Sequence, residues 1–163
     1  ASFDAVVVSA GVGSKKIANT VGDSLDIYPV KGYSVTINNV PLDYLPFVSL
    51  LDDEAKIVSS SLDNRLRVAG TAEFAGYNND IRKERTKPLL EWVHKHFPDI
   101  DTSNYTEWAC CRPMTPNMLP IVKQSSKNPA VFYNTGHGHL GWTLGAYTGK
   151  QVTDLIKDYL NGK

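Results

Sequence analysis

Three short apolar segments follow one another in the middle of the chain, between residues 47 and 74. They read "FVSLLD", "KIVSSSLD" and "RLRVAGTAEF", and turns rich in Asp and Asn separate them. Short apolar runs bounded by such turns are typical of strands that succeed one another through tight connections. The middle of the chain is therefore predicted to form an antiparallel meander, so the fold must contain an antiparallel sheet.

Further strands are predicted on both sides of the meander. The run "DAVVVSAG" near the N-terminus is continuously apolar and β-branched, which favours a buried strand of the parallel kind. The segment "LDIYPVKGYSVTIN" is predicted to be extended, and Pro29 and Gly32 within it indicate a bend between sheets or an edge position. "YTEWACC" and "AVFYNT" are further predicted strands, and "RPMTPNMLP" between them is predicted to be an irregular loop.

Three helices complete the prediction. A short one covers residues 15–19, and a second is capped by Asn78 or Asn79 and extends to about His96, with a kink or a split at Pro88. The last runs from about Gly141 to Leu160 along an apolar stripe. Together these elements predict an α+β fold with a mixed and antiparallel sheet.

Composition restricts the class of protein. The 163 residues are 42% hydrophobic and 21% charged, which suits a soluble globular protein with one core or two small lobes. Seventeen basic residues balance seventeen acidic ones, so no nucleic-acid partner is expected. We expect an intracellular protein, because the N-terminus lacks a basic signal-peptide region and no apolar run approaches the roughly 20 residues of a membrane span.

Two local features qualify this picture. The only cysteines, Cys110 and Cys111, are adjacent and are expected to be free thiols, since a bridge between neighbours is strained. A strand that begins so close to the first residue suggests a chain cut out of a longer protein, with removal of an initiator Met as the rival explanation.

The glycines of "GHGHLG" raise the question of a dinucleotide site. Gly136, Gly138 and Gly141 fit the G-x-G-x-x-G spacing, but a complete fingerprint requires a second strand after the helix, and the chain ends at Lys163. Close approach of the backbone to a flat or anionic ligand group remains one interpretation, and ordinary turn and cap glycines remain the other. The histidines beside these glycines have no further metal ligands near them in sequence, so no metal site is predicted.

A family resemblance rests on motifs that occur in order along nearly the whole chain. They are "VVVSAGVGSKK", "YPVKGYSVT", "RLRVAGTAEFAGYN", "DTSNYTEWACCRPMTPNMLPIV" and "NTGHGHLGWTLGAYTGKQVTDLI". The chain resembles the C-terminal portion of the flavin-dependent amino-acid oxidoreductases of the D-amino acid oxidase group, and within it the bacterial D-amino acid dehydrogenases. In that family the FAD pyrophosphate motif lies upstream, so the resemblance implies a missing N-terminal FAD-binding half as a partner.

The resemblance also implies domains and site residues. Residues 1–24 and 116–163 would belong to the FAD domain, and residues 25–115 to a substrate domain. Arg112 would hold the substrate carboxylate, with a structural salt bridge as the alternative, and Tyr77 would offer a hydroxyl to the substrate, with core packing as the alternative. The cofactor-binding residues would be Gly11, Gly13, Gly136, His137, Gly138, Leu140, Gly141, Trp142 and Thr143.

The implied activity is oxidation of a D-amino acid to a 2-oxo acid and ammonia, with hydride transfer to FAD. A related amine oxidase acting on glycine, sarcosine or proline, and a non-catalytic binding domain, are the alternatives. The resemblance further implies an electron acceptor in the respiratory chain and a cytoplasmic protein peripheral to the inner membrane. One departure from the family pattern matters for the fold, because Asn117 and Met118 stand where an Asp-Gly turn is expected.

Overall fold

The computed structural model describes residues 2–162, which form two compact units. The first unit comprises Ala1–Val30 and Arg112–Lys163, and the second comprises Lys31–Cys111. In chain order the elements are β1 (Val6–Val8), η1 (Gly11–Gly13), α1 (Ser14–Val21), β2 (Tyr28–Ile37), η2 (Leu42–Tyr44), β3 (Leu50–Asp52), β4 (Ile57–Leu62), β5 (Arg65–Glu73), α2 (Lys83–His96), β6 (Tyr105–Met114), β7 (Ile121–Gln124), β8 (Val131–Thr135) and α3 (Gly141–Asn161). The predicted α+β fold class is confirmed.

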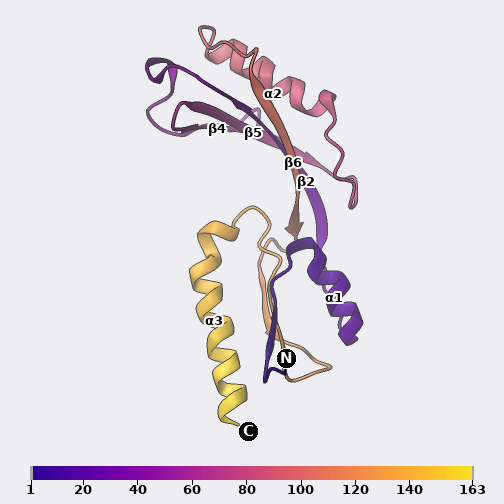
Figure 1. The fold of residues 1–163 in the computed structure, drawn as a ribbon. Helices are drawn as coiled ribbons and strands as arrows, with labels where there is room; N and C mark the ends of the chain where they lie inside the picture. Colours follow the sequence, from indigo (N-terminus) through magenta and orange to yellow (C-terminus); the bar gives the residue numbers. More distant parts are fainter. Residues whose placement is uncertain (1, 163) are drawn as a thin grey trace. The chain divides into compact units, whose positions relative to one another are not determined.

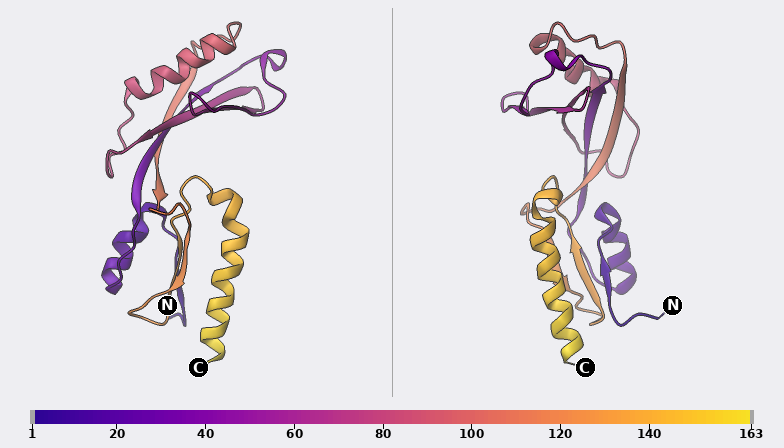
Figure 2. Two further views of the ribbon diagram at one scale, coloured as in Figure 1. Left: turned by 180° about the vertical axis from the view of Figure 1, so that it is seen from behind. Right: turned by 60° about the vertical axis from the view of Figure 1, so that its left-hand side comes forward.

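The first unit is built on a three-stranded sheet in the order β1-β8-β7. β1 pairs parallel with β8, Val6 opposite Val131, and β7 pairs antiparallel with β8. Helices α1 and α3 lie on opposite faces of this sheet (Figure 1), and the two further views in Figure 2 agree. The buried apolar side chains of the unit are Val8, Ala18, Leu25, Ile27, Val131 and Tyr133.

A buried carboxylate holds the hairpin between β7 and β8. Asp23, which follows α1, accepts hydrogen bonds from the hydroxyls of Ser125, Ser126 (2.6 Å) and Tyr133 (2.8 Å). The two serine hydroxyls, together with that of Tyr133, outweigh burial and lower the pKa of Asp23 well below its ordinary value. The charge of Asp23 therefore fixes a hairpin about a hundred residues further along the chain.

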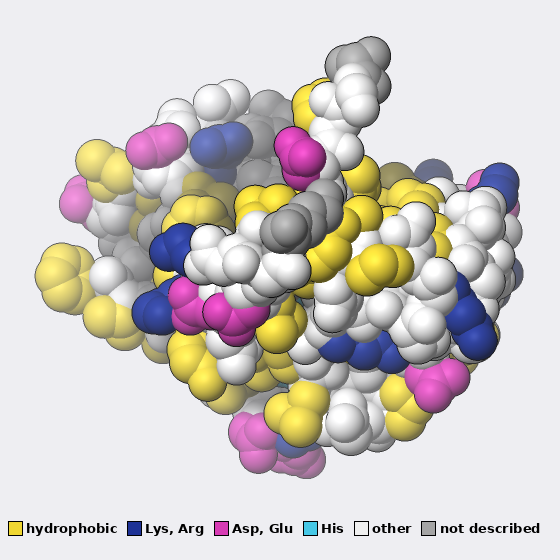
Figure 3. All heavy atoms as spheres, turned by 90° about the horizontal axis from the view of Figure 1, so that it is seen from below, with side chains coloured by type: hydrophobic (Ala, Val, Ile, Leu, Met, Phe, Trp, Pro, Cys, Tyr) yellow, Lys and Arg dark blue, Asp and Glu magenta, His cyan; other side chains and the backbone are white. Residues whose placement is uncertain are grey.

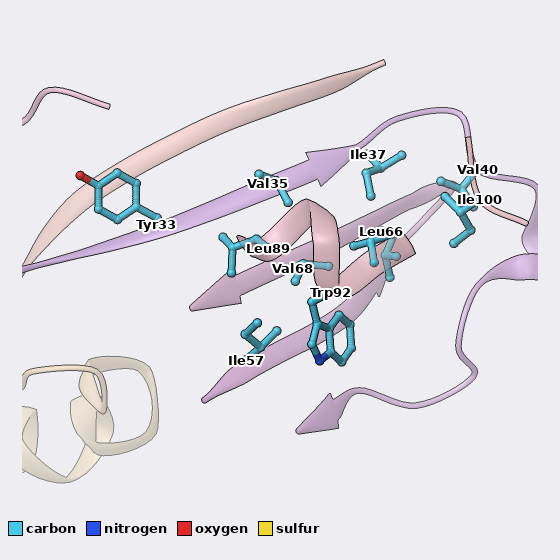
Figure 4. Close-up of a cluster of buried hydrophobic side chains, with 11 residues drawn as sticks. Tyr33, Val35, Ile37, Val40, Ile57, Leu66, Val68, Leu89, Trp92 and Ile100 are labelled. Carbon is cyan, nitrogen blue, oxygen red and sulfur yellow. The ribbon is translucent and has the colours of Figure 1, made fainter. Parts of the chain in front are cut away.

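The second unit is built on a five-stranded sheet in the order β3-β4-β5-β2-β6. The β3, β4 and β5 strands pair antiparallel in sequence, so the predicted meander is confirmed. Helix α2 covers one face of this sheet, and its side chains Leu89 and Trp92 pack against β2, β4 and β5 (Figure 4). The buried cluster between them consists of Tyr33, Val35, Ile37, Val40, Ile57, Leu66, Val68, Leu89, Trp92, Val93 and Ile100.

Two predictions about strand position are corrected. β2 lies between β5 and β6, so it is not an edge strand, and the bend indicated by Pro29 and Gly32 appears as a register shift between Lys31 and Tyr33. β1 is parallel as predicted, but it is not buried as predicted, since Val6 and Val7 are 50% and 39% exposed. The reason is that β1 has a neighbour on one side only within the described sheet.

The second helix begins later than predicted. α2 starts at Lys83 rather than after Asn78 or Asn79, because the side chain of Asn78 accepts a hydrogen bond from the backbone N–H of Asp80 within the preceding loop. The helix is also not split, since Pro88 lies inside it. Pro88 deprives only the Glu84 carbonyl of its helical donor, and both residues are exposed, so water can replace that donor.

The segment from residue 105 to 124 also differs from its prediction. β6 continues through Arg112, Pro113 and Met114, so the loop begins only at Thr115. A proline is tolerated here because β6 is the last strand in the sheet order, where an N–H can face away from the ladder. β7 was not predicted, because its four residues show no clear alternation of apolar and polar side chains.

The charges of the molecule are mixed. On the face shown in Figure 3, basic and acidic side chains are both scattered among hydrophobic ones, consistent with the balanced composition. Over residues 2–162, no helix is both long and apolar enough to cross a membrane.

Candidate functional site

The two glycine turns meet at one edge of the small sheet. β1 and β8 are parallel, so their carboxyl ends lie at the same edge, which is where α/β sheets bind ligands. Thr135, at the end of β8, donates a hydrogen bond to the carbonyl of Gly11 (3.3 Å) and shares another with the Ser14 hydroxyl (2.9 Å). The structure therefore brings the predicted cofactor residues Gly11 and Gly13 together with the turn that begins at Gly136.

The turn after β8 requires glycine at two positions. Gly136 and Gly138 have φ angles of +76° and +56°. A Cβ at Gly136 would lie 2.8 Å from Cγ2 of Thr115, and one at Gly138 would lie 2.7 Å from Sδ of Met114. These glycines therefore serve the packing of the turn, and they also leave its backbone without side chains.

A backbone hydrogen bond joins this turn to the predicted substrate residue. The N–H of Gly138 donates to the carbonyl of Pro113 at 3.0 Å, and Pro113 follows Arg112 in β6. The half-buried Arg112 is thus held in the same unit as the glycine turn. Tyr77 belongs to the second unit, where it is exposed on the segment between β5 and α2, and its substrate role stays a prediction.

The start of α3 offers hydrogen-bond donors. Leu140 occupies the N-cap position and makes no side-chain cap, and the first helical bond runs from the N–H of Leu144 to the carbonyl of Leu140 (2.9 Å). The backbone N–H groups of Gly141, Trp142 and Thr143 therefore have no acceptor within the helix, and all three residues are exposed. The aligned peptide dipoles of this 21-residue helix add a partial positive charge at the same place.

His137 joins the turn to the helix. Its Nε2 lies 2.9 Å from the hydroxyl of Thr148, which itself donates to the carbonyl of Leu144. The Thr148 hydroxyl therefore accepts a hydrogen bond from the Nε2–H of His137, and burial lowers the pKa of His137. This supporting role of His137 was missed by sequence reasoning, and the sequence carries no signal that pairs these two residues.

Within the described part of the chain, no three His, Cys, Asp or Glu side chains come together in a way that could hold a metal ion.

Comparisons with known proteins agree on one family. The model of the DAO family, described as FAD dependent oxidoreductase, matches residues 1–155. D-amino acid dehydrogenase 3 of Mesorhizobium japonicum is 52% identical over 157 residues, which cover 94% of this chain and 38% of that protein. The D-amino acid dehydrogenase of Dechloromonas aromatica is 40% identical over 154 residues, covering 94% and 37%. The chain thus spans less than two fifths of the length of these relatives.

Solved structures share the fold. The glycine oxidase of Geobacillus kaustophilus superposes with a TM-score of 0.80 at 25% identity, over 94% of this chain and 41% of that one. L-alpha-glycerophosphate oxidase from Mycoplasma pneumoniae, solved with FAD bound, superposes with a TM-score of 0.77 at 17% identity, over 94% and 42%. At that identity the second likeness concerns the fold alone.

The residues at the glycine turn fit a flavin. "GHGHLGWT", residues 136–143, contains no carboxylate, and the donors at the start of α3 suit an electron-rich ring edge. The Cβ positions of Gly136 and Gly138 face Thr115 and Met114, so these two glycines are required by the packing of the turn, and the fit to a flavin rests on the donors at the start of α3.

Proposed function

This chain belongs to the DAO family of FAD-dependent oxidoreductases, and from that premise we propose that it forms the C-terminal part of a D-amino acid dehydrogenase. The full-length protein would oxidise D-amino acids to 2-oxo acids and ammonia. The observation that carries the proposal is the hydrogen bond from Gly138 to Pro113, because it couples the glycine turn to the strand that bears Arg112.

Each part of the site has a role in this proposal. Bound FAD would supply the acceptor for the hydride that leaves the substrate Cα. The N–H groups of Gly141, Trp142 and Thr143 would stabilise negative charge on the ring edge near them. Arg112 would bind the substrate carboxylate through its two-pronged guanidinium, and Tyr77 would offer its hydroxyl to the substrate.

The predicted domains enter the proposal unchanged. Residues 1–24 and 116–163 would complete the FAD domain, and residues 25–115 would form most of the substrate domain. The pyrophosphate of FAD would bind to a segment of the full-length protein upstream of residue 1. Electrons would pass to a respiratory-chain acceptor at the inner face of the inner membrane.

Substrate selectivity tests the proposal. The full-length protein, loaded with FAD, is given D-alanine, L-alanine, glycine or sarcosine without oxygen, and reduction of an artificial electron acceptor is followed. We expect turnover with D-alanine and little with the others. In a parallel assay with oxygen as the sole electron acceptor, turnover of glycine or sarcosine would favour the related amine oxidases instead, as the glycine oxidase fold permits. Absence of flavin and of all turnover would favour a non-catalytic domain.

A further inference from the structure

Lys31 is a buried cation in the second unit. Its side chain is 0% exposed, and its Nζ lies 3.1 Å from Oε2 of Glu73. Nζ also donates to Oδ1 of Asn78 (3.1 Å) and to the carbonyl of Asp80 (2.9 Å). These three partners match the three protons of an ammonium group, so Lys31 is satisfied. Burial of such a charge is costly, and a well-packed apolar side chain would often stabilise a fold as well.

Glu73 is the counter-charge at the centre of the network. It lies opposite Lys31 in the pairing of β5 with β2. Its Oε2 accepts the hydroxyl proton of Tyr33 (2.6 Å), and its Oε1 lies 3.0 Å from Arg82 and 3.3 Å from Arg85. The pKa of Glu73 is lowered to about 2 by the hydrogen bonds from Tyr33 and Lys31 and by the charge of Arg82, which together outweigh the effect of burial.

The partners of this network lie mainly on one irregular segment. Residues 74–82, here called the 74–82 segment, join β5 to α2. Lys31 binds Asn78 and Asp80 within it, and Glu73 binds Arg82 at its end. The thiol of Cys111 adds weak contacts with the carbonyl of Gly76 (3.8 Å) and with Oδ1 of Asn79 (3.6 Å).

The network borders the apolar core at Tyr33. Tyr33 is the one member that belongs to both, since its ring packs in the core while its hydroxyl points away from the other labelled side chains (Figure 4). The 74–82 segment carries two exposed aromatic residues, Phe74 and Tyr77. A buried ion pair thus fixes a segment that has no helix or strand and that presents aromatic rings to its surroundings.

We propose that Lys31 and Glu73 are positioning residues that hold the 74–82 segment so that Tyr77 is placed to contact the bound amino acid. This inference rests on the proposed function. Lys31 acts through the segment, because its Nζ contacts Asn78 and Asp80 of the segment as well as Glu73. Its other neighbour, the Tyr33 ring at 5.3 Å, belongs to the same network, since the Tyr33 hydroxyl donates to Glu73. An apolar replacement can preserve folding, but it cannot bind Asn78 and Asp80.

The test uses Lys31→Met in the full-length protein with FAD and D-alanine. We expect KM to rise about tenfold while kcat falls less than about threefold, because a contact made equally with substrate and transition state affects KM and leaves kcat largely unchanged. FAD content should equal that of the wild type. The control is Lys56→Met, which removes an exposed lysine of the same unit that pairs only with Asp53, and it should leave KM unchanged.

A double-mutant cycle identifies the route of the effect. In a Tyr77→Ala background, Lys31→Met should raise KM less than about twofold, because the contact that it positions is already gone. If the KM increases caused by Lys31→Met and by Tyr77→Ala multiply in the double mutant, the proposal is overturned. If Lys31→Met fails to fold, Asn78→Ala replaces it, since it removes one acceptor and leaves the ion pair intact. We expect Asn78→Ala to raise KM and to speed amide exchange within residues 74–82.

The outcomes separate this inference from the proposed function. Absence of D-alanine turnover by the wild type would overturn the proposed function and the positioning role together. Normal wild-type turnover with unchanged KM in both Lys31→Met and Asn78→Ala would overturn the positioning role alone.

Discussion

Among single residues, Arg112 carries the most chemistry in the proposed site. A guanidinium presents two parallel N–H donors that match a carboxylate, whereas an ammonium acts as a point charge. Arg112 lies in β6, and the bond between Pro113 and Gly138 fixes the strand at this point. The position of its backbone is therefore set before any substrate arrives.

We expect Arg112→Ala in the full-length protein to weaken D-alanine binding about 100-fold, because a buried carboxylate would lose a charged partner. Arg112→Lys should recover only part of that loss. FAD content should not change, and Arg65→Ala, at a surface arginine paired with Asp63, serves as the control. KM and the flavin spectrum report the two effects separately. Loss of FAD with unaltered substrate binding would reassign Arg112 to structure.

Some residues cannot be assigned a role from the local sequence alone. Arg112 could be selected only through the family resemblance, since an isolated arginine in a strand is ordinarily a salt-bridge residue. The pair of Lys31 and Glu73 was missed, because their contact depends on a strand register that joins residues 42 positions apart. The signal that could have found it was a lysine within the apolar strand "YPVKGYSVT".

At the scale of elements, the turn after β6 contains a residue with a positive φ that is not a glycine. Met118 has a φ of +62°, a conformation that suits glycine. The hydroxyl of Thr115 donates to the carbonyl of Leu119 (2.8 Å), and the side chain of Asn117 accepts the N–H of Leu119 (3.1 Å). These bonds hold Met118 in a conformation that costs about 1–2 kcal/mol for a residue with a Cβ.

Met118→Gly should therefore raise the free energy of unfolding by about 1 kcal/mol, because strain is removed and the lost side chain is half exposed. Urea denaturation of the full-length protein measures the change. Leu119→Gly is the matched control, because Leu119 is also exposed but does not have a positive φ. This substitution should lower the free energy of unfolding. Equal destabilisation by both substitutions would show that the turn is not strained.

Elements with strong local signals were predicted well, and those set by distant partners were not. The meander and α3 follow from turns and apolar periodicity within their own sequences. The start of α2 depends on Asn78, whose side chain is held in the loop by Lys31 and by Asp80. β7 depends on a hairpin that Asp23 fixes from far away in the sequence.

At the scale of the whole molecule, each of the two units contains residues to which the proposed function gives a role. The first unit brings the two glycine turns and Arg112 together, and the second holds the 74–82 segment by a buried ion pair. Composition predicted one core or two small lobes, and the structure has two units, each with its own buried cluster. The order of strands within each sheet could not be predicted, because pairing of β1 with β8 spans most of the chain.

We propose that this chain completes a flavin site in a longer protein, and that the site accepts electrons from a D-amino acid. The most direct measurement is the visible absorption spectrum of the chain mixed with its upstream half and FAD, before and after anaerobic addition of D-alanine. We expect a flavin band that forms only with the upstream half and bleaches with D-alanine. A band that never forms, or one that D-alanine leaves unchanged, would contradict it.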